Sequence, residues 1–158
     1  MRKNFGAKPM LYPMPVLIIG TYDENGKPNA MNAAWGGQCS TRHVALNLAI
    51  GHKTTENLLK KKAFTLSISN LENLVLSDYF GLVSGHKTNK IEVAGVHVSK
   101  SVFVDAPVIE EYPLTLECKV VSMEERFGEM YVVGEVLNMQ ADESILDAAG
   151  RVDYDKLK

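Results

Sequence analysis

The chain has 158 residues and 46% apolar side chains, which is enough for one packed core and cramped for two, so we expect a single domain over residues 1–158. Its 17 basic and 19 acidic residues give a net charge of −2, a balance that excludes the basic surface with which proteins grip DNA or RNA. The N-terminus lacks a signal-peptide pattern, and no apolar run approaches the roughly 20 residues that span a bilayer, so we expect no nucleic-acid and no membrane partner. Two cysteines without a spacing pattern are typical of a reduced, cytoplasmic protein.

Strand signals dominate the first half of the chain. Residues 16–21 (VLIIGT) form an apolar run, and the Asn-Gly pair that follows predicts a hairpin turn, because both residue types tolerate a positive φ. Residues 28–35 are then the returning strand. Residues 44–50 and 63–69 have the pattern of two further strands.

Helical signals are fewer. Residues 54–62 (TTENLLKKK) carry a glutamate in the first turn and lysines in the last, which is the order that a helix dipole favours. Residues 73–82 and 145–149 predict two more short helices. All three segments connect predicted strands or follow the last one.

The second half of the chain returns to strands. They are predicted at residues 93–98, 114–122 and 130–137, with a turn around residues 126–129 joining the last two. The crossover helices that a parallel sheet requires are mostly missing. The pattern therefore favours a mainly β fold, an antiparallel barrel with short peripheral helices.

The stretch GHKTTEN at residues 51–57 follows a predicted strand and opens a predicted helix. Backbone N–H groups at a helix N-terminus stabilise phosphate, and Lys53, Thr54 and Thr55 add a charge and two hydroxyl donors. The alternative is helix capping, in which a threonine satisfies the same N–H groups without a ligand. From these residues alone, capping is the commoner explanation.

The stretch SGHKTNK at residues 84–90 is a second loop with basic and hydroxyl side chains. These donors suit a phosphate or the carbonyl edge of a ring. A solvated surface loop is the commoner explanation of such a composition. The spacing of a P-loop is absent.

The stretch NAAWGGQCS at residues 32–40 surrounds the one tryptophan with small residues. Small residues let a ligand approach the backbone, and Trp35 would then stack on or border a planar ring. The alternative places Trp35 in the core and its glycines in a bulge that turns the strand. The sequence leaves both interpretations open.

No side chain is predicted to act as a catalytic nucleophile. Cys39 has no histidine partner that the sequence indicates, and no serine–histidine–carboxylate set is apparent. The four histidines lack the spacing of a metal site, so no metal is predicted. Cys118 lies in an apolar alternation and is expected in the core.

Taken in order, these motifs resemble the flavin reductase-like family of FMN-binding split β-barrels, and most closely its flavoredoxin branch. The similarity covers residues 9–140 and rests on the Asn-Gly hairpin, NAAW ahead of Cys-Ser, HKTTEN, SGHKTNK and the AGV that follows. The resemblance implies an antiparallel split barrel of Greek-key type. It also implies a homodimer that binds FMN non-covalently near the dimer interface.

The resemblance implies three groups of FMN contacts in this chain. Residues along the isoalloxazine ring, its polar edge or the ribityl chain are Asn32, Ala33, Ala34, Trp35, Cys39 and Ser40. Residues at the ribityl phosphate are His52, Lys53, Thr54, Thr55 and Asn57. Residues that match the basic pattern expected at the flavin are Ser84, Lys87 and Lys90.

The chain departs from the family pattern in three places. Many relatives have an arginine where His52 or Lys53 stands, and lysine or histidine holds phosphate only as a point charge, so the phosphate grip is expected to be looser. Relatives often have Asp-Lys-Phe where residues 89–91 are Asn-Lys-Ile. They also commonly continue past a Tyr-Asp-Lys-Leu-like stretch, so a C-terminal element that helps to cover the flavin is expected to be missing.

The implied function is that of an FMN-dependent oxidoreductase. NAD(P)H or a redox protein would donate electrons through the flavin to a free flavin, a ferric complex or a protein, while Lys87 or Lys90 would stabilise the reduced flavin. One alternative is a non-enzymatic FMN electron carrier between partner proteins. The other is a ligand-binding or structural barrel that has lost its flavin.

Overall fold

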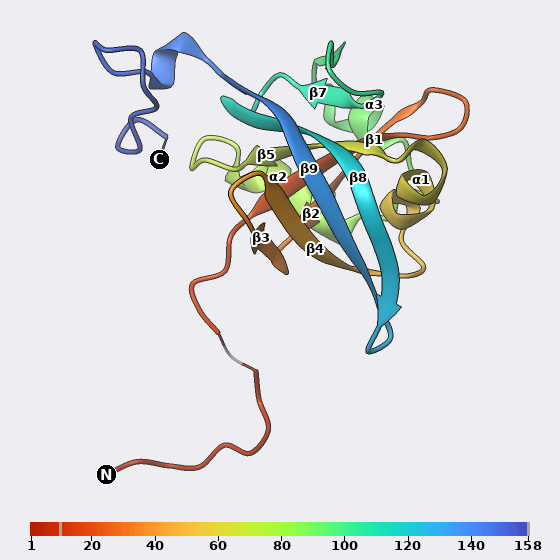
Figure 1. The fold of residues 1–158 in the computed structure, drawn as a ribbon, viewed down its shortest axis with the longest axis vertical. Coiled ribbons are helices and arrows are strands. Elements are labelled where there is room, and N and C mark those ends of the chain that lie inside the picture. The colour runs from red at the N-terminus through yellow and green to blue at the C-terminus, as the bar shows by residue number, and fades with distance from the viewer. Residues whose placement is uncertain (10, 158) are drawn as a thin grey trace.

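The structure, a computed structural model, describes residues 1–9 and 11–157. Its main sheet is antiparallel, has seven strands in the order β2-β1-β5-β8-β9-β4-β3, and curls into an open barrel (Figure 1). These strands are β1 (Leu17–Tyr22), β2 (Pro28–Ala33), β3 (Gly36–Gln38), β4 (His43–Ala49), β5 (Ala63–Ile68), β8 (Leu114–Arg126) and β9 (Glu129–Ala141). The mainly β, split-barrel fold predicted from the sequence is confirmed.

The remaining elements are short. The helices are α1 (Lys53–Lys61), α2 (Leu74–Leu82) and α3 (Lys90–Ala94), and a 3₁₀ turn spans Glu143–Ile145. A small separate sheet pairs β6 (Val98–Lys100) with β7 (Pro107–Ile109). Within the described residues, no helix is long and apolar enough to cross a membrane.

Two buried clusters hold the sheet between them. Ile19 of β1 belongs to the cluster inside the barrel, and its neighbour Ile18 belongs to a second cluster with Phe80 of α2 and Ile109 of β7. Because both faces of β1 are covered, its sequence is a continuous apolar run without alternation. Cys118 is fully buried in the first cluster, as expected.

The predicted elements differ from the structure in three places. The expected strand at 93–98 is wrong: α3 covers residues 90–94 and ends at Gly95, whose φ of 66° makes a left-handed helix cap. The expected helix at 145–149 is also wrong, because the chain turns at the 3₁₀ segment and again near Asp147. The β8–β9 hairpin is longer than predicted and projects beyond the barrel, where its polar outer residues give no apolar alternation (Figure 1).

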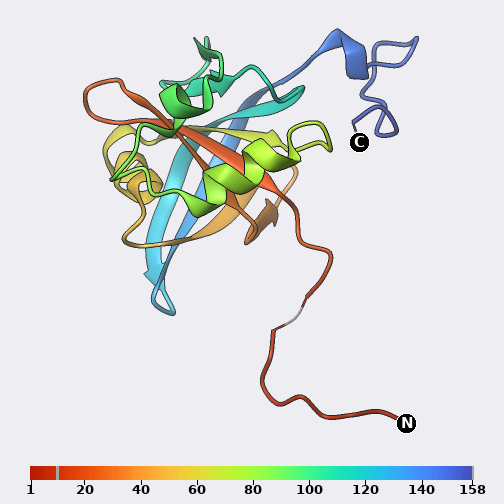
Figure 2. The ribbon, with the colours of Figure 1, turned by 180° about the vertical axis from the view of Figure 1, so that it is seen from behind.

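All three helices contact β2, and α1 also contacts β1. Seen from behind, α2 crosses the sheet near these two strands, and α3 lies above α2 in this view (Figure 2). The N-terminal end of α1, the end of α2 and the loop that leads to α3 therefore meet around β2. This meeting point holds most of the polar residues that the sequence singled out.

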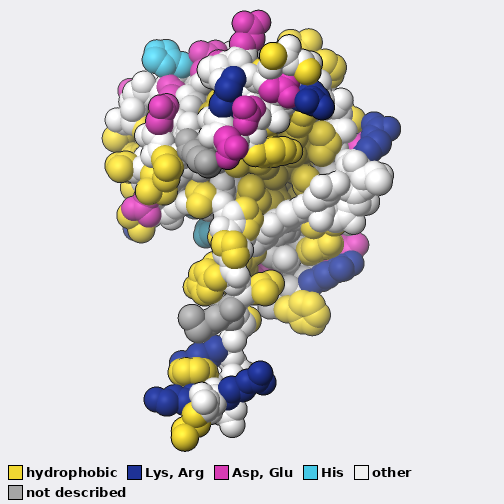
Figure 3. Space-filling view, turned by 90° about the vertical axis from the view of Figure 1, so that its left-hand side faces the viewer, with side chains coloured by type: hydrophobic (Ala, Val, Ile, Leu, Met, Phe, Trp, Pro, Cys, Tyr) yellow, Lys and Arg dark blue, Asp and Glu magenta, His cyan; other side chains and the backbone are white. Residues whose placement is uncertain are grey.

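The N-terminal segment before β1 extends away from the barrel (Figures 1 and 2). We refer to its described residues, 1–9 and 11–14, as the arm. Figure 3 shows basic and hydrophobic side chains along the arm and a hydrophobic hollow in the barrel wall above its root.

Candidate functional site

The N-terminus of α1 is open. His52 occupies the N-cap position, and its side chain makes no capping hydrogen bond. The hydroxyl of Thr54 accepts a hydrogen bond from the Asn29 amide (3.0 Å), and the hydroxyl of Thr55 donates to the Ala49 carbonyl (2.8 Å). Threonine capping, one of the two interpretations of this stretch, is therefore wrong. The first backbone N–H groups of α1 stay available to a ligand.

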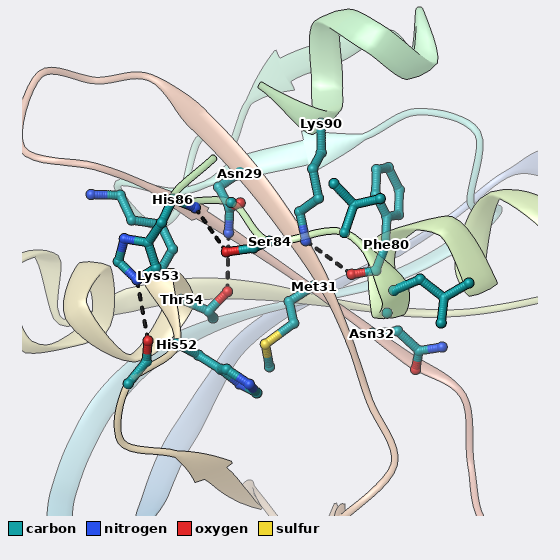
Figure 4. A pocket seen from close by; sticks show the side chains of 15 residues that line it. Asn29, Met31, Asn32, His52, Lys53, Thr54, Phe80, Ser84, His86 and Lys90 are labelled. Atoms are coloured by element: carbon teal, nitrogen blue, oxygen red, sulfur yellow. Dashed lines mark hydrogen bonds between the residues drawn. The ribbon is translucent and has the colours of Figure 1, made fainter. Parts of the chain in front are cut away.

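A cavity of about 180 Å³ lies at this helix end (Figure 4). Three segments line it: β2, the turn that enters α1, and the chain from the end of α2 to α3. The side chains that face it include Asn29, Met31, Asn32, His52, Lys53, Thr54, Phe80, Ser84, His86 and Lys90.

The loop of residues 84–88 closes one side of the cavity. His86 Nε2–H donates to the Gly51 carbonyl (3.2 Å), and the His86 backbone N–H donates to Ser84 Oγ (3.3 Å). At Gly85 the loop lies so close to β2 and α1 that an added Cβ would collide with the Asn29 side-chain oxygen and lie 3.2 Å from Lys53 Cβ. Only glycine fits this approach.

Lys53 brings a positive charge to the open helix end. Its Nζ lies 3.1 Å from Glu56 Oε1, and Lys60 Nζ lies 3.3 Å from the same oxygen. Hydrogen bonds from Lys53 and then Lys60 hold the pKa of Glu56 below its usual value. Because Lys60 also pairs with this carboxylate, Lys53 can turn toward an anion without leaving Glu56 unpaired.

Lys90 is the most buried lysine at the site. Its Nζ donates to the Phe80 carbonyl (2.9 Å), near the end of α2, and lies 5.9 Å from the centre of the Phe80 ring. Burial lowers the pKa of Lys90 to about 8. The side chain thus ties α3 to α2 and carries a charge that an anionic ligand would stabilise.

A second cavity of about 280 Å³ adjoins the first, and Met31, Asn32 and His52 line both. Ala33, Ala34 and Trp35 line it as well, and Trp35 is 57% exposed. The core placement of Trp35 is therefore wrong. We refer to the two cavities together as the cleft. The cleft runs from the N-terminus of α1 to Trp35.

The structure brings nine of the predicted site residues together along the cleft. They are Asn32, Ala33, Ala34, Trp35, His52, Lys53, Thr54, Ser84 and Lys90. They come from β2 and the two residues after it, from the N-cap and first turn of α1, from the 84–88 loop and from α3. The fold brings these separate segments together.

Five predicted residues do not line the cleft. Cys39 and Ser40 lie in the β3–β4 turn, where Ser40 Oγ lies 2.7 Å from His43 Nδ1. Thr55 and Asn57 are turned into the protein, and the Asn57 amide donates to the Thr21 hydroxyl (3.0 Å). The fifth, Lys87, is exposed in the 84–88 loop.

Several lining residues were not predicted. His86 and Gly85 stand inside the SGHKTNK stretch, so a closer reading of that motif would have found them. Asn29 and Phe80 carry no such signal, since they reach the cleft only through strand pairing and helix packing.

Within the described residues, neither the Cys118 thiol nor a metal site supplies further chemistry. Burial raises the pKa of the Cys118 thiol to about 12, so this cysteine carries no reactive thiolate. Among the residues that the structure describes, no group of histidine, cysteine, aspartate and glutamate could hold a metal ion.

Comparisons with known proteins agree with this fold. Residues 10–155 match the model of the flavin reductase like domain. The chain is similar to the flavoredoxin of Desulfovibrio vulgaris (Miyazaki F), with 33% identity and a TM-score of 0.93 over 99% of this chain and 85% of that one. It is similar to the flavoredoxin from Methanosarcina acetivorans, with 28% identity and a TM-score of 0.91 over 99% and 83% of the two chains. It shares its fold with an FMN-binding protein from Thermus thermophilus, with 21% identity and a TM-score of 0.82 over 96% and 86%.

Proposed function

Because the chain belongs to the flavin reductase-like family, near its flavoredoxin branch, we propose that it binds FMN in the cleft and transfers electrons through it. The observation that carries this proposal is the open N-terminus of α1 at one end of a cleft whose other end is Trp35. A phosphate group and a planar ring need these two kinds of surface.

The residues present fit the phosphate of FMN. The uncapped N–H groups of α1 and the ammonium group of Lys53 form an anion-binding end, and Ser84 and His86 face it from the opposite loop. Each cavity alone is smaller than the roughly 300 Å³ at which ligand pockets begin, so a ligand of that size would occupy both. An elongated ligand with a phosphate at one end suits this shape.

The residues at the other end fit a flat ring. Ala33 and Ala34 present little more than backbone, and Trp35 offers an exposed aromatic surface beside them. Backbone groups and an aromatic border hold a heterocycle by hydrogen bonding and stacking.

Bound FMN would supply the hydride or electron transfer itself. The chain would bind and orient it: Lys53 and the α1 N–H groups would hold the phosphate end, and Lys90 would place a second positive charge on the wall of the first cavity. A positive charge at this place favours the more negative form of a ligand beside it. We propose NAD(P)H or a redox protein as the electron donor, and a flavin, a ferric complex or a protein as the acceptor.

A second candidate is an electron carrier without an enzymatic activity of its own. The 33% identity and the TM-score of 0.93 to a flavoredoxin favour it. In this case the same FMN site would relay electrons between two proteins. The enzyme and the carrier differ in whether a nicotinamide nucleotide alone reduces the flavin.

We further propose that the chain forms a homodimer. Four large apolar side chains, Trp35, Val121, Leu137 and Met139, are exposed on or beside the β3, β8 and β9 part of the sheet. Large apolar side chains that stay exposed on a sheet are candidates for a contact surface.

An absorbance titration tests the proposed function. The purified chain is mixed with FMN and then treated under anaerobic conditions with NADH, NADPH and finally dithionite. Bound flavin bands that bleach with a nicotinamide nucleotide would support a reductase. Bands that persist until dithionite is added would support the carrier. A chain that shifts no flavin band and enriches no FMN on dialysis would overturn the FMN site.

A further inference from the structure

The arm exposes apolar side chains that a free surface segment would not be expected to carry. Phe5, Leu11 and Tyr12 are 71%, 83% and 66% exposed. Within the described residues of the arm, the one backbone hydrogen bond is local, from Lys8 N–H to the Gly6 carbonyl. The arm therefore presents both apolar side chains and unpaired backbone groups.

The arm is part of the chain that superposes on a relative. The alignment with the D. vulgaris flavoredoxin covers 99% of this chain at a TM-score of 0.93, a share too large to leave residues 1–14 out. The first residues of a domain stay poorly ordered unless they are tied down, so an arm that packs on nothing of its own barrel needs another surface to hold it.

An apolar groove lies at the root of the arm. It has a volume of about 420 Å³, and its apolar lining includes Leu17, Val44, Ile68, Leu116, Val136 and Met139. Gly37 and Gln38 of β3, an edge strand of the main sheet, form part of its rim. An apolar groove beside a sheet edge accepts an extended segment through side-chain burial and backbone pairing.

The arm and the C-terminal segment carry opposite charge, while Arg42, which lines the groove itself, is paired with Glu135 (3.2 Å). The arm carries Arg2, Lys3 and Lys8 and no acidic residue, whereas residues 141–157 carry five carboxylates against two basic side chains. Figure 3 shows acidic side chains, with basic ones among them, above the hydrophobic hollow, and basic side chains along the arm. Opposite charges of this kind guide an arm onto such a surface.

The arm is poorly placed to fill the groove of its own chain. Pro15 lines the groove, and the segment Pro13–Pro15 that leads away from it is stiffened by two prolines. The arm runs outward from this point (Figure 1). A return into the same groove would require a reversal within the proline segment.

We infer that the arm of one copy lies in the groove of a second copy, and that the second copy returns the same contact. Because the arm starts at the edge of the groove, a two-fold axis beside the groove brings each arm to the partner's groove over a short span. This inference rests on the homodimer proposed above and names the surface and the segment that hold it together.

Molar mass measured by light scattering during gel filtration tests the exchange with two single variants of the full chain. Leu11→Asp places a charge on the arm, and Met139→Asp places one in the groove at a side chain that is 54% exposed. Each is expected to raise the dimer dissociation constant at least tenfold. Val93→Asp, at an exposed position of α3, is the matched control and should leave the dimer unchanged.

A mixture of the two variants separates exchange from a contact within one chain. The Met139→Asp copy keeps an intact arm and the Leu11→Asp copy keeps an intact groove, so the mixture should recover one arm contact and form heterodimers more tightly than either variant alone. Variants that stay as dimeric as the wild type would overturn the arm contact and leave the homodimer standing. A wild-type chain that is monomeric at tens of micromolar, or a mixture without recovery, would overturn the exchange.

Discussion

The backbone of Gly85 lies against the side chain of Asn29, so closely that a Cβ atom at residue 85 would collide with the Asn29 amide oxygen. Asn29 in turn donates a hydrogen bond to the Thr54 hydroxyl in the first turn of α1 (3.0 Å). Through these contacts one glycine sets how closely the 84–88 loop approaches the open end of α1. The width of the phosphate end of the cleft depends on that approach.

Gly85→Ala should therefore widen the phosphate end. The added methyl group must displace Asn29 or the loop, and overpacking of this kind costs about 1–3 kcal/mol. We expect FMN binding, measured by quenching of flavin fluorescence, to weaken at least tenfold. Gly37→Ala is the control, since a Cβ there meets open space and Gly37 lies outside the cleft. Equal FMN affinity in the two variants would contradict the role of Gly85.

Lys53→Met should separate FMN from riboflavin. A hydrogen bond to a charged group contributes about 1.5–3 kcal/mol, which corresponds to roughly 10- to 100-fold in affinity. The affinity for FMN should fall by this factor. The affinity for riboflavin, which has no phosphate, should change little. Lys61→Met, in the last turn of the same helix, should change neither affinity. A parallel loss of both ligands in Lys53→Met would place the phosphate elsewhere.

The sequence predicted the motifs of the cleft better than the side of each motif that faces it. HKTTEN is at the predicted helix start, but Thr54 faces the cavity while Thr55 and Asn57 are buried against Ala49 and Thr21. Adjacent residues of a helix point in different directions, so which of them face a ligand depends on how the helix docks on the sheet. That docking is not encoded within the motif.

The same dependence on packing explains which strands could be predicted from the sequence. The β1–β2 hairpin was predicted because its turn signal is local, whereas the strand expected at 93–98 is a helix that ends at Gly95. Apolar residues at 91, 93 and 96 suit either a strand or a short helix, and packing of Ile91 against the cluster with Phe80 favours the helix. Asn29 could not be assigned to the cleft because its neighbours there come from residues 53, 54 and 85.

Thr55→Val should affect stability and not phosphate recognition. The buried Thr55 hydroxyl donates to the Ala49 carbonyl, which also accepts from the His52 backbone N–H, so the loss of this one hydrogen bond should cost about 0.5–1.5 kcal/mol. Urea unfolding should report this loss, while the ratio of FMN to riboflavin affinity stays that of the wild type. Thr55→Ser keeps the hydroxyl and should recover most of the stability. A change of the affinity ratio in Thr55→Val would return Thr55 to the phosphate site.

Lys90→Met should change how stability depends on pH. Burial lowers the pKa of Lys90 from 10.5 to about 8 in the folded chain. Between these two pH values the unfolded chain binds more protons than the folded one, so the Lys90 contribution to the free energy of unfolding rises with pH across this window and is least favourable below pH 8.

The methionine variant has no such titration and also loses the hydrogen bond to the Phe80 carbonyl. Its stability relative to the wild type should therefore be most favourable near pH 7 and decline by about 3 kcal/mol toward pH 10.5. Urea unfolding of both proteins at several pH values measures this difference. Parallel curves would mean that Lys90 keeps its ordinary proton affinity inside the fold, and that burial does not disfavour its charged form.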